Sequence, residues 1–123
     1  EDNTFDFLVS WNVIHYEGNE KGIIQSLKEY ARVLKPTGRL LLSSTGPEHF
    51  ILNDSKNVGQ HLYEITLKSD FRCGQVHFNF DNKDYIEYYF EPYFNNLKIG
   101  RVHDELFDRR STLDWWIVSG IKK

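Results

Sequence analysis

Several residue types and patterns are scarce in this sequence, and each absence narrows the class of protein. A single cysteine, Cys73, excludes a disulfide within the chain, so a reducing, cytoplasmic location is expected. No apolar run approaches the roughly 18 residues of a membrane span, and no signal-peptide pattern opens the chain. The 15 Lys and Arg are outnumbered by 18 Asp and Glu, which argues against a nucleic-acid-binding surface. We therefore expect neither a membrane nor a nucleic-acid partner.

Methionine is absent altogether, although translation begins with one. The first residues also lead into an apolar segment almost at once. Both features predict that the chain is a piece of a longer protein. Its 123 residues suffice for one compact domain, so we expect residues 1–123 to be a single domain or part of one.

The first third of the sequence predicts a β-α-β unit. Phe5–Ser10 and Arg39–Ser44 are apolar runs without alternation, which is typical of parallel strands covered on both faces. Between them, Glu20–Leu34 has apolar residues at helical spacing, Asn19 as a candidate cap and Pro36 as a stop. A parallel pair joined by a helix is the expected result.

The remaining elements are predicted less sharply. Gly46 and Pro47 favour a short helix through Leu52, and residues 53–59 are polar enough for a loop. We expect a strand hairpin at 62–67 and 75–80. A helix capped by Asp81 should follow, with an aromatic stripe over 85–94 and a kink at Pro92. The chain should end in antiparallel strands at 97–103 and 115–121. The polar link 104–114 is short enough to join those last two strands.

At this point the order of motifs resembles a known family. The segment FDFLVSWNVIHY, an amphipathic helix and LKEYARVLKPTGRLLLSS resemble the fourth strand, the following helix and the fifth strand of class I S-adenosylmethionine-dependent methyltransferases. Thr37 replaces the commoner first glycine of the family's turn. The resemblance implies an α/β fold: the C-terminal half of a Rossmann-like methyltransferase sheet, parallel strands with an antiparallel C-terminal strand pair and helices on its faces.

The resemblance also implies a cofactor, S-adenosylmethionine, and a set of site residues. In the family, positions equivalent to Ser10, Trp11 and Asn12 approach the cofactor, and those of His15 and Tyr16 lie on the acceptor side. The glycine-rich loop and the acidic strand end that hold this cofactor have no counterpart here, so we expect the isolated chain to bind it weakly or not at all and to be inactive alone. Trp11 either stacks on the adenine or plugs the sheet edge.

Two further assignments leave alternatives open. The Tyr85–Phe94 stripe forms either a core face or, through Tyr85 and Tyr89, the lining of an acceptor pocket. The other histidines, His49, His61, His77 and His103, show no close pairing in sequence, and no metal site is expected.

The function that follows is methyl transfer from S-adenosylmethionine to a small-molecule acceptor. The alternative is a non-catalytic α/β association module derived from the same fold. Without a neighbour on its other side, the strand Phe5–Ser10 would be an open edge, and we expect a homodimer or larger assembly with Phe5, Phe7 and Val9 near the contact.

His15 supplies the first testable prediction. If it is the base that deprotonates the acceptor, His15→Gln in the full-length enzyme should lower turnover by about a hundredfold, while cofactor affinity barely changes. The alternative role is a histidine whose hydrogen bonds hold the loop. Steady-state kinetics together with cofactor titration separate the two, because unchanged turnover would assign His15 the structural role.

Overall fold

The structure is a computed structural model that describes residues 1–105, 107 and 112–123. Its helices and strands are, in chain order, β1 Phe5–Trp11, the 3₁₀ turn η1 Ile14–Tyr16, α1 Glu20–Val33, β2 Leu34–Thr45, the 3₁₀ turn η2 Phe50–Leu52, β3 Ser55–Gly59, β4 Leu62–Ile65, β5 Val76–Phe78, α2 Lys83–Phe90, β6 Phe94–Glu105 and β7 Thr112–Lys122.

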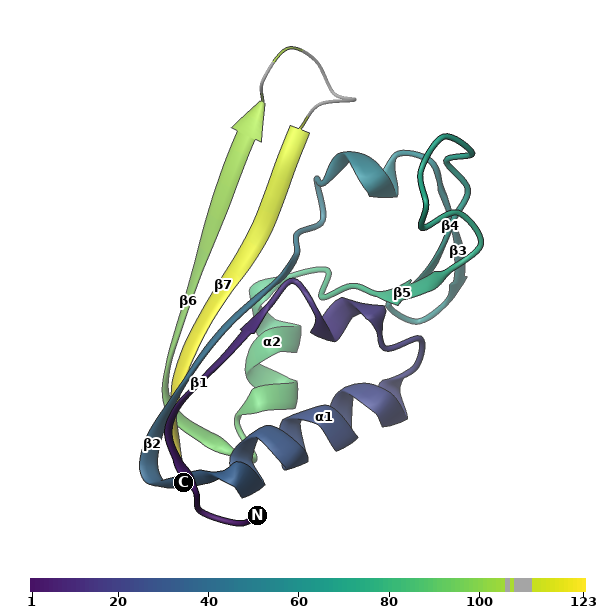
Figure 1. Ribbon diagram of the computed structural model, residues 1–123. Helices are drawn as coiled ribbons and strands as arrows, with labels where there is room; N and C mark the ends of the chain where they lie inside the picture. Colours follow the sequence, from purple (N-terminus) through teal and green to yellow (C-terminus); the bar gives the residue numbers. More distant parts are fainter. Residues whose placement is uncertain (106, 108–111) are drawn as a thin grey trace.

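The main sheet has the strand order β1-β2-β7-β6 (Figure 1). β1 runs parallel to β2, and α1 connects the two strands as the sequence predicts. β7 lies antiparallel between β2 and β6. The expected α/β architecture, with parallel strands and an antiparallel C-terminal strand pair, is confirmed.

Both helices pack on one face of this sheet (Figure 1), and the hydrophobic core lies between the helices and the sheet. Asn19 caps α1 as predicted, because its side chain accepts a hydrogen bond from the backbone N–H of Gly22 at 2.7 Å. The side chains that meet in this core are fully buried and come from α1, α2, β2 and β7: Ile23, Leu27, Ile86, Phe90, Leu40, Leu42 and Val118.

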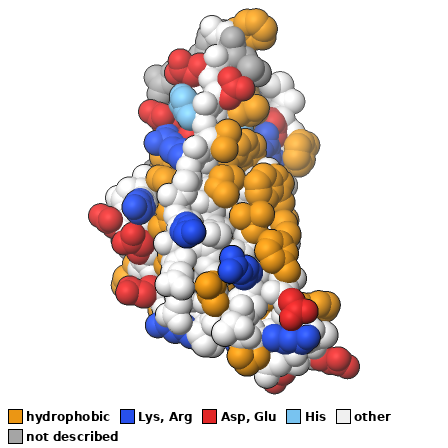
Figure 2. Space-filling view, turned by 90° about the vertical axis from the view of Figure 1, so that its left-hand side faces the viewer, with side chains coloured by type: hydrophobic (Ala, Val, Ile, Leu, Met, Phe, Trp, Pro, Cys, Tyr) orange, Lys and Arg blue, Asp and Glu red, His pale blue; other side chains and the backbone are white. Residues whose placement is uncertain are grey.

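The opposite face carries no helix in the described part of the chain, and Figure 2 shows hydrophobic side chains gathered on it. Phe5, Phe7, Val9 and Trp11 are each slightly more than half exposed, whereas Leu8 and Ser10 point into the molecule. β1 is also an edge strand, since β2 is its only neighbour among the described strands. The sequence analysis predicted this single neighbour.

A smaller antiparallel sheet, β3-β4-β5, lies in the insertion between β2 and α2 (Figure 1). The predicted hairpin at 62–67 and 75–80 is confirmed as β4 and β5, which are shorter than expected. The prediction of a loop at 53–59 is wrong, because Ser55–Gly59 forms β3 and pairs with β4. Exposed backbone pairing needs no apolar alternation, so the polar sequence of β3 gave no strand signal.

The boundary between α1 and β2 differs from the prediction. Leu34 is not the last helical residue; it has an extended ψ of 140° and pairs with Phe5 as the first residue of β2. Pro36 therefore lies two residues inside the strand segment. Its ring disfavours helix at the preceding residue, which is consistent with a helix that ends at Val33.

The second helix is also corrected. Asn82, rather than Asp81, caps α2 by accepting from the N–H of Tyr85 at 3.2 Å. Asp81 instead accepts hydrogen bonds from Tyr63 and contacts His61. The helix ends at Phe90, so Pro92 does not kink it, and Phe94 already belongs to β6.

Three smaller points complete the fold. The short helix expected from Pro47 is only the 3₁₀ turn Phe50–Leu52. The final strands are longer than predicted, and the middle of their connection, residues 106 and 108–111, lies outside the described residues. None of the described helices combines the length and apolar character needed to cross a membrane.

Candidate functional site

The predicted cofactor residues lie at the carboxyl end of β1. Strand alternation sends Ser10 and Trp11 to opposite sides. Ser10 is buried, with its hydroxyl 3.0 Å from that of Tyr30 on α1, whereas the Trp11 ring is half exposed on the bare face. Of the two side chains, only the Trp11 ring is accessible to a ligand.

Asn12 turns the chain immediately after β1. Its φ of 55° lies in the left-handed region, which asparagine tolerates better than most residues. Ser43 of β2 fixes this turn: its Oγ accepts from the backbone N–H of Asn12 at 2.8 Å and donates to Oδ1 of Asn12 at 2.7 Å. The loop after β1 is thereby tied to the neighbouring strand.

His15 and Tyr16 form an aromatic cluster with His77 of β5. The His15 ring centroid lies 4.8 Å from Tyr16 and 5.4 Å from His77, and Tyr16 and His77 are 4.7 Å apart. His15 and His77 are buried, whereas Tyr16 is partly exposed. The cluster joins the loop after β1 to the small sheet, a contact between residues 15 and 77 that no local pattern predicts.

Burial keeps the histidines of this region neutral. It lowers the pKa of His15 to about 3, with smaller contributions from His77, His49 and Arg72. Burial, followed by the charge of Arg72, also lowers the pKa of His49 and of His77 to about 4. The Nδ1 atom of His15 is buried and has no partner among the described residues. At neutral pH, His15 is thus an uncharged ring beneath Tyr16 and His77.

Tyr85 and Tyr89 lie elsewhere, on α2. Tyr89 donates a hydrogen bond to Glu20 at 3.1 Å, and burial together with this carboxylate raises the pKa of Tyr89 to about 12. The ring of His61 packs against Tyr85 at 4.2 Å. Most of the predicted aromatic stripe is core, since Ile86, Tyr89, Phe90 and Phe94 are buried and only Tyr85 and Tyr93 are partly buried.

The structure does not bring the two groups of predicted substrate residues together. His77 of β5 contacts His15 and Tyr16, while its neighbour Phe78 contacts Tyr89 at 5.5 Å. Consecutive residues of a strand point to opposite faces, so β5 separates the η1 loop from the α2 tyrosines.

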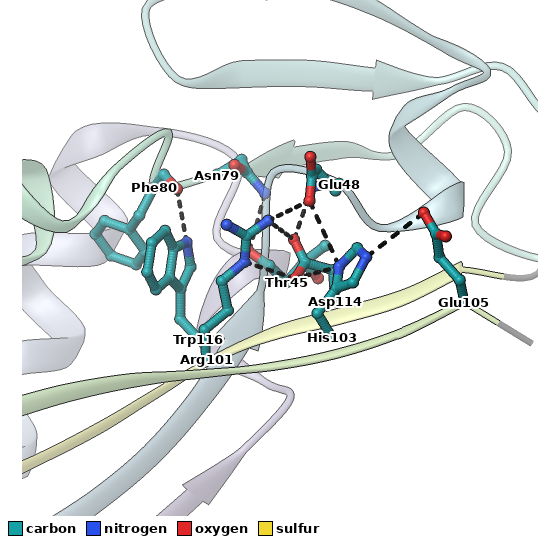
Figure 3. Close-up of polar contacts among 9 residues, drawn as sticks. All are labelled: Thr45, Glu48, Asn79, Phe80, Arg101, His103, Glu105, Asp114 and Trp116. Carbon is teal, nitrogen blue, oxygen red and sulfur yellow. Dashed lines mark hydrogen bonds and ion pairs between the residues drawn. The ribbon is translucent and has the colours of Figure 1, made fainter. Parts of the chain in front are cut away.

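A second polar cluster was missed in the sequence (Figure 3). Asp114, at the start of β7, is fully buried and accepts from Nε and Nη2 of Arg101 at 2.7 Å each. It also accepts from the backbone N–H of Glu48 at 2.8 Å, and Nδ1 of His103 lies 3.2 Å away. Arg101 in addition donates to Glu48 at 2.8 Å and lies over the Trp116 ring. The cluster ties the loop that leaves β2 to strands β6 and β7.

The electrostatics of Asp114 follow from these donors. Burial alone would raise its pKa, but the hydrogen bonds from Arg101, Glu48 and His103 outweigh burial, and the pKa lies below its usual value. The loop approaches so closely that a Cβ at Gly46 would collide with the Asp114 carboxylate. Glycine is therefore required at this point of the exit from β2.

Glu48, His103 and Asp114 have their ligand atoms within 4.8 Å of one another, the only such spacing within residues 1–105, 107 and 112–123. Arg101 already fills the space between the two carboxylates, with bonds of 2.7–2.8 Å to both. A cation would have to displace this guanidinium, so the arrangement is that of an ion-pair network. The expectation of no metal site stays a prediction.

The pattern of β7 contained a signal for this cluster. Thr112, Asp114, Trp116 and Val118 alternate as inward-facing, buried residues. A carboxylate in such a series has to meet a buried donor. The sequence analysis began the strand at Trp115 and so assigned Asp114 to the polar link.

Comparison with known proteins gives a family match over part of the chain. Residues 1–42 match the family model described as a methyltransferase domain. No curated protein matches the sequence. The chain has the class I methyltransferase fold.

Three solved structures illustrate the similarity of fold. A Pyrococcus horikoshii protein is 20% identical, with a TM-score of 0.64, and the match covers 100% of this chain and 54% of the Pyrococcus chain. A Burkholderia thailandensis 1,6-didemethyltoxoflavin N1-methyltransferase is 15% identical (TM-score 0.67; 100% and 46% covered). A Methanosarcina mazei S-adenosylmethionine-dependent methyltransferase is 16% identical (TM-score 0.66; 99% and 61% covered). This chain thus spans about half the length of these structures.

Within the methyltransferase fold, the family match covers one part of the candidate site. Its range, 1–42, contains Ser10, Trp11, Asn12, His15 and Tyr16. Tyr85 and Tyr89, as well as the Arg101–Asp114 cluster, lie beyond it. The roles of all these residues stay predictions.

The neutral histidines predict a pH dependence of folding. The folded pKa of His77 is about 4 against an ordinary 6.5, so the unfolded state binds more protons between these values. The free energy of unfolding should be highest above pH 6.5 and fall as the pH drops toward 4. His77→Asn should make this fall shallower, measured by urea unfolding across the pH range.

The control is the free energy of unfolding of the parent chain and of His77→Asn at pH 8, where the histidine is uncharged in both the folded and the unfolded state. Parallel stability curves for the parent and His77→Asn between pH 6.5 and 4 would contradict the assignment.

Proposed function

We propose that this chain is part of an S-adenosylmethionine-dependent methyltransferase that acts on a small-molecule acceptor. One observation carries the proposal: β1, within the family match, ends at a half-exposed Trp11 followed by the left-handed turn at Asn12. In an open α/β sheet, ligands lie beyond the carboxyl ends of the parallel strands. The segment 10–12 is therefore the part of the chain that faces the cofactor.

The residues of this turn fit such a ligand unequally. The open face of the Trp11 ring suits stacking on an adenine. The Nδ2 group of Asn12 makes no hydrogen bond to the described residues and can donate to a ligand. The hydroxyl of Ser10 is engaged with Tyr30, so Ser10 contributes through its backbone. A bound cofactor would supply an electrophilic methyl group on its sulfonium.

The acceptor side is formed by η1 together with the small sheet. Methyl transfer is an in-line displacement, so holding the acceptor in line supplies most of the rate. The ring cluster of His15, Tyr16 and His77 holds the small sheet against the loop after β1. His15 could accept a proton only after Tyr16 or His77 moves, because it is 2% exposed.

The size of the acceptor is argued from a relative of similar fold. The Burkholderia enzyme binds 1,6-didemethyltoxoflavin together with S-adenosylhomocysteine. A small-molecule acceptor of that kind would suit a site whose walls are aromatic. This supports a small-molecule acceptor for the present chain, without identifying it.

Binding of S-adenosylhomocysteine to the isolated chain tests the proposal. We expect weak but saturable binding that shifts the indole N–H resonance of Trp11 in NMR titrations. Binding is weak because the sequence contains no Gly-x-Gly turn to hold the cofactor. Trp116 is the internal control, since its indole N–H donates to the carbonyl of Phe80 at 2.8 Å inside the fold.

Asn12→Gly tolerates the left-handed turn but lacks the amide, and it should weaken binding further. Equal shifts of Trp11 and Trp116, or no saturable shift of Trp11 at all, would reject this segment as the cofactor wall. Micromolar affinity would contradict the expected weakness.

A second candidate function, association without catalysis, is favoured by the exposed edge. Within the described part of the chain, β1 has no strand partner along its free side, and an apolar row of Phe5, Phe7, Val9 and Trp11 lies beside this edge. Edges of this kind pair readily with another strand. A second copy of the chain, pairing β1 with β1, would cover both features.

Sedimentation at increasing protein concentration tests this candidate. We expect a dimer or larger assembly, and Val9→Lys should shift the equilibrium toward monomer by placing a charge in the contact. Val58→Lys, at a similarly exposed position of β3, is the matched control. A concentration-independent monomer for the parent chain would eliminate the association module.

A further inference from the structure

A pocket of about 490 Å³ lies between α2, the start of α1 and the β3–β4 turn. It is separate from the segment 10–16, because β5 lies between the α2 tyrosines and the η1 loop. Its lining contains three tyrosines, two carboxylates and two amides, and no Lys, Arg or His: Glu20, Gln60, Asn82, Asp84, Tyr85, Tyr88 and Tyr89.

Two of the tyrosine rings form a corner. Tyr88 and Tyr89 have centroids 5.1 Å apart and planes inclined at 84°, so they stand almost perpendicular to each other. Tyr88 is 69% exposed, which leaves its ring available to a ligand. The Tyr89 ring is only 6% exposed, so the accessible electron-rich face of this corner is that of Tyr88, and such a face attracts alkylated ammonium groups.

The charge of the pocket has one sign. Neither Glu20 nor Asp84 forms an ion pair within the described part of the chain. Both lie in the first turn of a helix, α1 and α2 respectively, where each helix end contributes roughly half a positive charge. Two carboxylates and two helix ends leave a net charge of about −1, which matches a monovalent cation.

Buried groups behind the rings reinforce this preference. The hydroxyl of Tyr89 donates to Glu20 and so holds that carboxylate at the pocket. His61 packs against Tyr85, and its Nδ1 lies 2.8 Å from the carboxylate of Asp81. Nε2 of His61 is buried and has no partner among the described residues. A further carboxylate, that of Asp81, therefore lies close behind the aromatic walls.

We propose that this pocket binds a small, monovalent organic ammonium ion, with its alkylated ammonium group against the exposed Tyr88 ring and near the carboxylates of Glu20 and Asp84. The site is independent of the cofactor wall proposed for Ser10–Asn12. Its occupancy does not require methyl transfer by this chain, so it can be tested on the chain alone.

Choline and its uncharged analogue 3,3-dimethyl-1-butanol form a matched pair of probes, since they share shape and differ in charge. Both are titrated into the chain at constant ionic strength, and the ring resonances of the tyrosines are followed by NMR. Choline should bind saturably and at least about tenfold more tightly than the alcohol. Equal affinity of the two probes, or no saturable binding of choline, would overturn the proposal.

Four variants on one exposed stretch of α2 locate the site. Tyr88→Ala and Asp84→Asn should each weaken choline binding by about three- to tenfold, whereas Tyr88→Phe keeps the ring and should keep the affinity. Glu87→Gln removes one charge from the same helix but lies outside the pocket, and it should leave binding unchanged. Because these side chains are exposed, each variant is expected to fold, and circular dichroism checks that it does. Unchanged affinity in both Tyr88→Ala and Asp84→Asn would place the cation elsewhere.

Discussion

The buried carboxylate of Asp114 is the constraint on which the arrangement of the chain's second half depends. A desolvated carboxylate is tolerated only when donors surround it, and this one draws them from two other segments, the loop after β2 and strand β6. To reach it, the backbone at Gly46 has to approach without a side chain. The exit of β2, and with it the direction in which the inserted small sheet begins, is set by this one charge.

A second constraint is the one-sided packing of the main sheet. Both helices cover the face that contains Leu40, Leu42 and Val118, so the hydrophobic effect stabilises one face and leaves Phe7 and Val9 in contact with water. Parallel strands are normally covered on both faces. The exposed row on β1 therefore lacks, among the described residues, the cover that a parallel strand usually has on its second face.

Local patterns predicted those parts of the fold in which side-chain burial and backbone structure agree. The helical spacing of Ile23 and Leu27 located α1, and the apolar runs located β1 and β2. Prediction failed where a distant contact decided the outcome. Asp81 has the chemistry of a helix cap, but Tyr63 and His61 compete for it, and Asn82 takes the cap. β3 is polar because it is exposed, so only its pairing with β4 reveals it.

The candidate site shows the same division between local and long-range information. Ser10, Trp11 and Asn12 could be named because they follow a recognisable strand. The cluster of His15, Tyr16 and His77 could not, since residue 77 reaches residue 15 only through the folded insertion. Adjacent residues of β5 then serve opposite surfaces: His77 contacts the loop after β1, and Phe78 supports Tyr89 beside the tyrosine pocket. The three-residue strand β5 thus contributes one side chain to each surface.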